Sequence, residues 1–373
     1  MARSATPNNI ARILRHQVER HLDAPAQAVL LPPVMIWGPP GVGKSAIIRD
    51  LCEEKGIGFV DIRLSQREPV DLRGLPVPRE DRVDWLLSGE WPRDPASAGI
   101  ILLDELTAAD RSLQVAAYEL ILDRRLGDLY ELPRGWMVVA AGNRVEDRAV
   151  AGMFSSALAN RFCHLEMAAD LDDWLRWANA SGVHADVMAF LRFQPRAFFD
   201  MTGNVEQGWP SPRSWERVSQ VLQQLGDALP AASLNAMVEG LIGTGAATEF
   251  LAFREQSRLL PDVAAMLDSR HPIVIPERAD QRYAFASALA RHVWPGPTAV
   301  ESDRLARFFQ ISEQLPSDFA TLALLDLMEA GEPGVREQRM GRVFAHSLFN
   351  DWSERHGAVF AEHFHANETR RCA

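Results

Sequence analysis

The 373-residue sequence contains few cysteines, no long apolar run and no excess of basic residues. Its three cysteines, Cys52, Cys163 and Cys372, are far apart, which excludes a disulfide framework and a zinc site with CxxC spacing. No stretch approaches the roughly 18 consecutive apolar residues of a membrane span, and the N-terminus lacks an apolar segment followed by a cleavage site. We therefore expect a globular, cytoplasmic protein whose cysteines are small buried hydrophobes.

The charge balance is acidic, with a formal net charge of -11 and a pI near 5.4. A protein that wraps nucleic acid normally presents a basic face that displaces counterions from phosphates. Non-specific nucleic-acid binding is therefore disfavoured, although a local basic stripe is compatible with this composition. The hydrophobic content of 47% supports ordinary packed cores, and the length suits two or three domains.

The most specific motif is GPPGVGKS, residues 38–45, which follows the apolar run 34–37 and precedes the helix-like stretch 46–51. Glycines let such a loop curl so that successive N–H groups point at phosphate oxygens, and the following helix adds the positive end of its dipole. In this motif Lys44 reaches the β- and γ-phosphates and the Ser45 hydroxyl binds Mg²⁺. The alternative, that these residues form a chance glycine turn, is disfavoured by the strand before the loop and the helix after it.

Strands and helices alternate along the first part of the chain. Residues 57–64 and 99–103 read as strands, 111–123 as a helix and 137–141 as a buried strand. Short apolar strands separated by helices predict an α/β fold with a parallel sheet covered on both faces. Two segments interrupt this order: the Pro-, Gly- and charge-rich residues 68–92, whose apolar pieces suit a hairpin, and a second expected hairpin at 126–136.

Polar residues follow the predicted strands at the edge of the sheet where ligands bind. Asp104 and Glu105 close the strand IILL, and Asn143 ends the next strand. In P-loop ATPases the first such acid holds Mg²⁺ and the second polarises the attacking water. Asn143 is placed to orient the same water and contact the γ-phosphate, although an Asn after a strand is also an ordinary turn residue.

From about residue 170 the sequence becomes helical, without further alternation of strands and helices. We predict an α/β nucleotide-binding core over 1–168 with an insert at 68–92, a helical lid over 169–228 and a helical C-terminal region over 229–373. Two arginines are candidates for the reaction. Arg161 suits an arginine finger offered to a neighbouring subunit, and Arg213, at a helix start, suits a contact with the γ-phosphate. A surface salt bridge is the alternative for Arg161, and arginines near helix starts are common.

These motifs, namely GPPGVGKS, IILLDEL, AAGN, ANRF and SPRSW, follow the order found in AAA+ ATPases, and over residues 32–225 the chain resembles the MoxR group. The resemblance implies an AAA+ P-loop core, an all-helical lid, and roles that are carried over by position. Asp104 is the magnesium acid, Glu105 the catalytic acid, Asn143 the sensor-one amide, Arg161 the trans finger and Arg213 the sensor-two arginine. Arg144 and Arg148 lie close enough to share the finger role. The nucleotide-binding set is Gly38, Pro39, Pro40, Gly41, Val42, Gly43, Lys44, Ser45 and Asp104, with Ser45 and Asp104 as metal ligands.

The implied function is Mg²⁺-dependent hydrolysis of ATP to ADP and phosphate by a homo-oligomeric ring, with six subunits as the family expectation. Such a motor remodels or activates a protein client, through an adaptor that carries a von Willebrand factor A (VWA) domain. Two alternatives stay open from the sequence: a nucleic-acid motor, as a helicase or coupled to a nuclease, and the motor subunit of a metal chelatase.

Two weaker signals concern histidine and tryptophan. His346, His356, His363 and His365 cluster near Cys372, but their spacing does not match a tetrahedral metal site, and a solvated tail is the favoured interpretation. Trp85 and Trp91 flank the insert and are either exposed for a partner or buried as an anchor. Trp174 and Trp177 share a helical face that is more typical of a core than of a ligand site.

Overall fold

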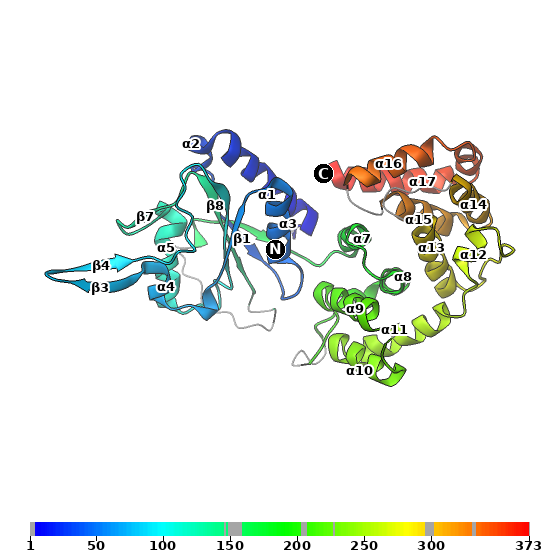
Figure 1. The fold of residues 1–373 in the computed structure, drawn as a ribbon, viewed down its shortest axis with the longest axis horizontal. Helices are drawn as coiled ribbons and strands as arrows, with labels where there is room; N and C mark the ends of the chain where they lie inside the picture. Colours follow the sequence, from blue (N-terminus) through cyan, green and yellow to red (C-terminus); the bar gives the residue numbers. More distant parts are fainter. Residues whose placement is uncertain are drawn as a thin grey trace. The chain divides into compact units, whose positions relative to one another are not determined.

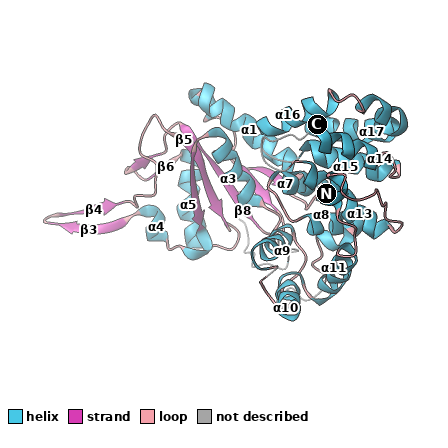
Figure 2. Ribbon diagram, turned by 45° about the vertical axis from the view of Figure 1, so that its right-hand side comes forward, coloured by secondary structure: helices cyan, strands magenta, loops and turns pink. Residues whose placement is uncertain are grey.

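The computed structural model describes residues 4–144, 147, 159–202, 207–226, 228–294, 302–329 and 333–372. The chain forms two compact units, Met1–Ala169 and Asp170–Ala373, each described here by itself. Strands lie in the N-terminal unit, and the described part of the C-terminal unit is helical (Figure 2). In the described residues, no helix combines the length and the apolar character that a membrane span needs.

A five-stranded sheet forms the centre of the N-terminal unit, in the order β2-β5-β8-β1-β9 (Figure 1). All of its pairings are parallel. The parallel sheet predicted from the alternation of strands and helices is therefore confirmed. Its strands are β1 Val34–Trp37, β2 Gly58–Arg63, β5 Ala98–Asp104, β8 Gly135–Gly142 and β9 Cys163–Glu166.

Helices cover both faces of this sheet, because its central strands are apolar on both sides. Ile101 and Leu103 of β5 belong to a core that also includes residues of α5. Ile100 and Leu102 are equally buried and, by the two-residue period of a strand, face the side of α1 and α3 (Figure 1). The helical segments of this unit are α1 Pro7–Asp23, α2 Pro25–Ala28, α3 Lys44–Lys55, the 3₁₀ turn η1 Leu64–Gln66, α4 Pro69–Arg73 and α5 Arg111–Asp123.

Both expected hairpins form. In the insert, β3 Leu75–Arg79 pairs antiparallel with β4 Arg82–Leu86, and the hairpin extends away from the sheet (Figure 1). Trp85 is 45% exposed on this hairpin, whereas Trp91 is 2% exposed and packs in the core beside Tyr130. The second hairpin pairs β6 Arg125–Leu126 with β7 Tyr130–Glu131.

The C-terminal unit contains a second, separate core. An ion pair inside this unit joins Arg192 of α8 to Asp326 of α15, with N–O distances of 2.5 and 2.7 Å. The predicted division into 169–228 and 229–373 stays a prediction. The helical segments are α7 Leu171–Ala180, α8 Ala185–Phe193, η3 Pro195–Phe198, α9 Pro212–Leu225, α10 Ala231–Ile242, α11 Thr244–Ser257, α12 Val263–Leu267, α13 Ala279–Val293, α14 Ser302–Ser312, α15 Ser317–Glu329, α16 Pro333–Phe344 and α17 Phe349–Cys372.

The interpretation of the last thirty or so residues as a solvated tail is wrong at His356, which is 2% exposed, whereas His363 is exposed, as expected. Most of this segment forms α17, whose Trp352 is also buried, at 0% exposure. A 2.9 Å hydrogen bond joins Nδ1 of His356 to the hydroxyl of Ser317 in α15. Phe349, Phe360 and Phe364 of α17 also pack against the core of the unit. Trp174, at 8% exposure, is core as expected, whereas Trp177, whose ring lies beside it, is 36% exposed.

Candidate nucleotide-binding site

The glycine-rich loop lies between the carboxyl end of β1 and the start of α3. Gly38 comes so close to β9 that a Cβ at this position would be 2.6 Å from the carbonyl oxygen of Met167. Gly41 and Gly43 have φ of 81° and 98°, in the left-handed region that glycine adopts without strain. Gly43 is also the N-cap of α3, so the loop turns directly into the positive end of a helix. Pro39, Pro40 and Val42 lie within this loop, as predicted from the sequence.

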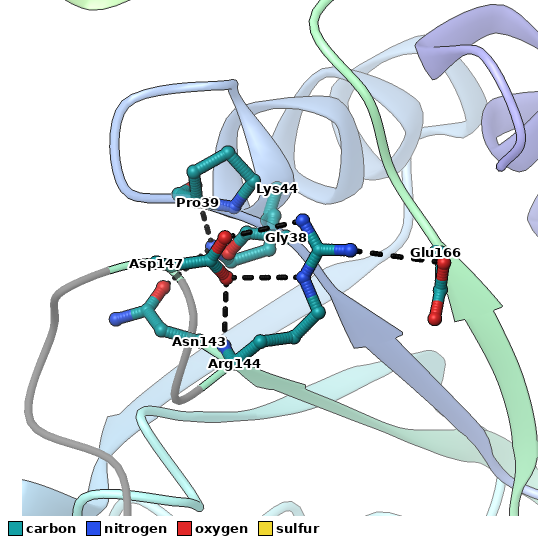
Figure 3. Close-up of polar contacts among 7 residues, drawn as sticks. All are labelled: Gly38, Pro39, Lys44, Asn143, Arg144, Asp147 and Glu166. Carbon is teal, nitrogen blue, oxygen red and sulfur yellow. Dashed lines mark hydrogen bonds and ion pairs between the residues drawn. The ribbon is translucent and has the colours of Figure 1, made fainter. Parts of the chain in front are cut away.

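Lys44 is the buried cation of the loop, with 8% of its surface exposed. Its ammonium donates to the carbonyl oxygens of Gly38 and Pro39 at 2.6 and 3.0 Å, and to Oδ1 of Asn143 at 2.9 Å (Figure 3). The structure thus brings together two predicted site residues that lie 99 positions apart in the chain. An ammonium held by three oxygens at the mouth of a phosphate-binding loop is positioned to exchange them for phosphate oxygens, which are charged acceptors.

Ser45 and Asp104 also meet, as their predicted roles require. The Ser45 hydroxyl donates a 2.6 Å hydrogen bond to Oδ2 of Asp104, at the carboxyl end of β5. A hydroxyl and a carboxylate side by side are hard oxygen ligands of the kind that Mg²⁺ takes together with substrate phosphates. Among the described residues no group of three or more His, Cys, Asp or Glu is placed to hold a metal ion.

Glu105 adopts an unusual backbone conformation for a residue with a side chain, with φ of 57°. Its N–H donates to Oδ1 of the preceding Asp104 at 2.9 Å. A non-glycine residue in the left-handed region costs about 1–3 kcal/mol, and such strain concentrates at functional sites. The hydroxyl of Ser65, in η1 after β2, donates a hydrogen bond to the Glu105 carboxylate. Sequence reasoning missed Ser65, because a serine after a strand is an ordinary turn residue.

Asp61 of β2 is a second site residue that the sequence did not single out. Burial, reinforced by the carboxylate of Asp104, raises the pKa of Asp61. Its Oδ1 is buried without a hydrogen-bond partner, and Arg49 of α3 lies 3.9 Å from its other oxygen. The signal that could have found it is an aspartate within an otherwise apolar alternation, one strand away from Asp104.

Arg144 follows Asn143 and is held by two acids. Its guanidinium bonds to Asp147 at 3.1 and 3.3 Å and lies 3.7 Å from Glu166 of β9 (Figure 3). Asp147 is 6% exposed and the Arg144 side chain is 35% exposed, so only the carboxylate of this ion pair is buried. Arg148, the other residue considered for the finger role, lies outside the described residues.

Arg161 is exposed, and its guanidinium lies over the ring of Tyr118 of α5 at 4.9 Å from the centroid. The sequence predicts a short helix that ends near Arg161, and its expected start near Ser155 lies outside the described residues. Arg213 is an exposed residue of the first turn of α9, which begins after the N-cap Ser211. The roles of Arg161 and Arg213 toward a nucleotide stay predictions.

The cysteines behave as small hydrophobes where they are described. Cys52 of α3 is buried, and burial raises the pKa of its thiol to about 11. Such a thiol stays protonated and inert at neutral pH. Cys163 is half-buried in β9, and neither residue forms a disulfide.

A parallel sheet with a glycine-rich loop after its first strand, a buried lysine, and a serine paired with a strand-end aspartate define a P-loop nucleotide-binding protein. Residues 34–164 match the family model described as "ATPase family associated with various cellular activities (AAA)". This part of the chain is therefore an AAA+ ATPase domain, and the helical C-terminal region follows it. The nucleotide-binding ATPase core that the sequence predicted is therefore confirmed. The match does not test the more specific assignment to the MoxR group.

One curated relative is Midasin of Giardia intestinalis, which is 33% identical over 128 residues. The match covers 31% of this chain, and the chain spans only 3% of the length of Midasin. Among solved structures, a mutant form of RuvB from Thermotoga maritima has 16% identity over 80% of this chain and 85% of its own, with a TM-score of 0.38. NtrX from Brucella abortus in complex with ADP has 16% identity over 90% of this chain and 69% of its own, with a TM-score of 0.36. Likeness at this level carries no conclusion about function or assembly.

Proposed function

We propose that this protein is a Mg²⁺-dependent AAA+ motor of MoxR type that hydrolyses ATP to ADP and phosphate and uses the resulting motion to remodel or activate a protein client. The observation that carries the proposal is the convergence of Lys44, Ser45, Asp104, Glu105 and Asn143 at one edge of the sheet. They come from three segments of the chain, and each bears a side chain suited to one part of phosphoryl transfer.

Each of these residues has a separate proposed role in binding or hydrolysing ATP. The N–H groups of the loop and the Lys44 ammonium hold the phosphates, while Ser45 and Asp104 would hold Mg²⁺, which neutralises phosphate charge when bound. Glu105 would accept a proton from the attacking water, and Asn143 would orient that water, because its amide already lies beside Lys44. The strained backbone of Glu105 fixes the direction of its side chain, and Ser65 holds the carboxylate.

We further propose that a neighbouring subunit completes this site through Arg161. A finger that acts in trans must be exposed on its own subunit, and Arg161 is exposed and stacked on Tyr118 rather than inserted toward Lys44. Arg144 is a weaker candidate, because extending it would break its ion pairs with Asp147 and Glu166. Contacts of this head-to-tail kind close into a ring or continue as a helix, and we expect a ring of six subunits.

The insert 68–92 supports a protein partner. Its hairpin exposes apolar side chains on both strands, including Leu75, Val83 and Trp85 at 59%, 53% and 45% exposure. Exposed apolar groups on a projecting element are typical of protein contacts. We propose that the hairpin contacts the client or a VWA-domain adaptor, that Arg213 couples the nucleotide to the helical region, and that the motor works in the cytoplasm.

The first experiment measures nucleotide binding and turnover separately. Lys44→Ala should weaken ATP binding by at least about tenfold, because a charge-assisted contact to phosphate is lost. Glu105→Gln should bind ATP normally and lower turnover by roughly 10²–10⁴-fold, the usual contribution of a general base. Glu53→Gln, at an exposed position of α3, is a matched control that should change neither quantity. Normal turnover by Glu105→Gln would show that the base is another residue.

The second experiment tests the shared site by mixing inactive variants. Arg161→Ala should lower turnover by roughly 10³-fold or more, as expected for a lost arginine finger. Mixed with Glu105→Gln protein, it should regain activity, because some junctions then combine an intact Glu105 with an intact Arg161. Absence of any rescue would place the function of Arg161 within one subunit.

The third experiment identifies what the motor acts on. Affinity purification with the Glu105→Gln form, loaded with ATP, should retain an adaptor or client, and a Trp85→Ser version should retain less of it. Stimulation of ATP hydrolysis by single-stranded or duplex DNA instead of by a protein would contradict the remodelling function.

A further inference from the structure

A pocket of about 210 Å³ lies in the N-terminal unit, at the end of the sheet opposite to the nucleotide site. Its wall includes Pro32 and Pro33, which precede β1, and Met137 and Val138 near the amino end of β8. Lys44 and Asn143, by contrast, follow the carboxyl ends of these same strands. The pocket is therefore separate from the ATP site and has no part in the roles proposed above.

Two basic side chains line this pocket, His21 of α1 and Arg124 after α5. The His21 ring is 5% exposed, and its Nδ1 lies 3.1 Å from the carbonyl oxygen of Arg134. A carbonyl only accepts, so the proton is on Nδ1, and Nε2 is left to interact elsewhere. Burial lowers the pKa of His21, and the nearby positive charge of Arg124 lowers it further.

Arg124 combines two unfavourable features at one position. Its φ is 56°, in the left-handed region, at a helix end where glycine is the favoured residue. Burial also lowers the pKa of its guanidinium, which Tyr130 and Glu131 only partly offset. One guanidinium nitrogen donates to the carbonyls of Pro133 and Trp136 at 3.0 and 2.7 Å, and no carboxylate of the described residues forms an ion pair with Arg124. Arg124 is half-buried, and charges removed from water are normally paired; the negative charge of Glu131 favours the guanidinium, but no carboxylate of the described residues lies within ion-pair distance of it.

Gln17 of α1 is a third polar residue of the wall, and the other lining residues are apolar, among them Leu30, Ile121 and Met137. Leu30 is 82% exposed, which places an apolar side chain at the rim. The volume corresponds to several water molecules at about 30 Å³ each, but it is smaller than the roughly 300 Å³ of pockets for drug-sized ligands. A fitting ligand is therefore small, with an anionic head and a short apolar body.

We propose that this pocket binds a small aliphatic carboxylic acid, whose carboxylate pairs with Arg124 and faces His21 while its hydrocarbon part contacts the apolar wall. The carboxylate supplies the anion that Arg124 lacks, and a guanidinium presents parallel N–H groups that match a carboxylate. The inference is independent of ATP hydrolysis and assigns a second ligand site to the opposite end of the sheet.

The rival explanation gives Arg124 a structural role only, as a clamp on the carbonyls of Pro133 and Trp136. The two explanations differ in what a ligand does. A clamp predicts no response of His21 to carboxylates. A binding site predicts that a bound anion stabilises the imidazolium and raises the pKa of His21.

The test uses the full chain with isotope-labelled histidine, and His21→Gln to assign the His21 resonance in NMR spectra. The probe is 4-methylpentanoate, and the neutral control is 4-methylpentanamide. We expect the carboxylate to shift the His21 resonance saturably and to raise the pKa of His21, and the amide to bind at least about tenfold more weakly. Equal binding of both probes, or no shift of His21 with either, would overturn the proposal.

Variants separate the pocket from the fold. Arg124→Gln should weaken the binding of 4-methylpentanoate by roughly tenfold or more. Substitution of the exposed neighbour, Arg125→Gln, should change this affinity less than about twofold. If Arg124→Gln does not fold, Leu30→Glu keeps Arg124 and places a negative charge at the exposed rim. Leu30→Glu should bind 4-methylpentanoate more weakly than Leu30→Gln does. Equal affinities of these two variants would contradict the carboxylate assignment.

One further arm distinguishes the source of the carboxylate. A tripeptide that ends in leucine presents the same carboxylate and a similar side chain, and its C-terminal amide is the control. We expect the free acid to bind more tightly than the peptide, because the pocket is small. Binding of the peptide without binding of the free acid would overturn the small-molecule assignment.

Discussion

Gly38 and Gly43 make different demands on the nucleotide-binding loop, and alanine substitutions separate them. Gly43→Ala meets no atom within 4 Å and adds only the strain of its positive φ, about 1–2 kcal/mol. Gly38→Ala would push a Cβ against the backbone oxygen of Met167, so it should lower the free energy of unfolding by a further roughly 1–3 kcal/mol. Urea unfolding of the N-terminal unit without nucleotide measures both. Equal losses of unfolding free energy in the two variants would show that the backbone at Met167, directly after β9, moves easily to make room for the Cβ.

His356 sets part of the pH dependence of the C-terminal unit. Burial lowers its pKa from 6.5, Arg355 adds to this effect, and Glu313 opposes it. The folded chain therefore holds the ring neutral while the unfolded chain takes up a proton, so the free energy of unfolding falls as the pH drops below about 6.5. Burial also lowers the pKa of His292 and His346, which steepens the same fall.

The variant His356→Phe should reduce this slope by at most about 1.4 kcal/mol per pH unit, the value for one proton. His363→Phe, at an exposed position of the same helix, is the control and should leave the slope unchanged. Urea unfolding between pH 7.5 and pH 5 measures the slope. The same slope in His356→Phe and the unchanged protein would mean that other groups cause the acid sensitivity.

Residues whose role follows from their immediate neighbours in the sequence could be predicted. Residues whose role depends on a contact with a distant part of the chain could not. Lys44 and Ser45 belong to one short motif, and Asn143 follows from its place after a strand. Ser65 and Asp61 matter only because β2 lies beside β5 in the sheet, which brings them near Glu105 and Asp104. Strand order is a property of the fold, so the role of neither residue follows from its neighbours in the sequence, although an aspartate in an otherwise apolar alternation marks Asp61 as unusual.

At the scale of elements, the insert hairpin and its anchor should respond differently to substitution. Trp85 is 45% exposed on β4, so Trp85→Ala should change the free energy of unfolding by no more than about 0.5 kcal/mol. Trp91 is 2% exposed and packs beside Tyr130, so Trp91→Ala should cost about 3–5 kcal/mol. Chemical denaturation of the two single variants checks this. A large loss with Trp85→Ala would mean that the hairpin packs on the body of the protein.

The same element scale explains why α17 was not predicted. Its sequence is rich in charged residues and histidine, and its apolar residues give only a weak helical period. The helix forms because Phe349 and Trp352 contact Phe309 of α14, and Phe360 packs against the same core of the unit. Tertiary packing supplies most of the stability of such a helix, and no window of local sequence contains it.

At the scale of the whole molecule, two separate cores predict two unfolding events. One core contains the sheet and α5, and the other contains α13, α15 and α17. Lys44 and Ser45, which we propose contact the nucleotide, belong to the unit Met1–Ala169. A ligand stabilises only the part of a chain whose folded form it binds.

Calorimetry of the intact chain should therefore show two transitions. A non-hydrolysable ATP analogue with Mg²⁺, at about 100 times its Kd, should stabilise the N-terminal unit by about 2.7 kcal/mol and raise its transition by roughly 5–10 °C. Lowering the pH from 7.5 to 5.5 should lower the other transition more strongly, because His292, His346 and His356, whose pKa values are lowered, lie in the C-terminal unit. Lys44→Ala provides the control, since it should remove the nucleotide shift and keep the pH shift. A single transition that responds to both nucleotide and pH would show that the two units unfold as one.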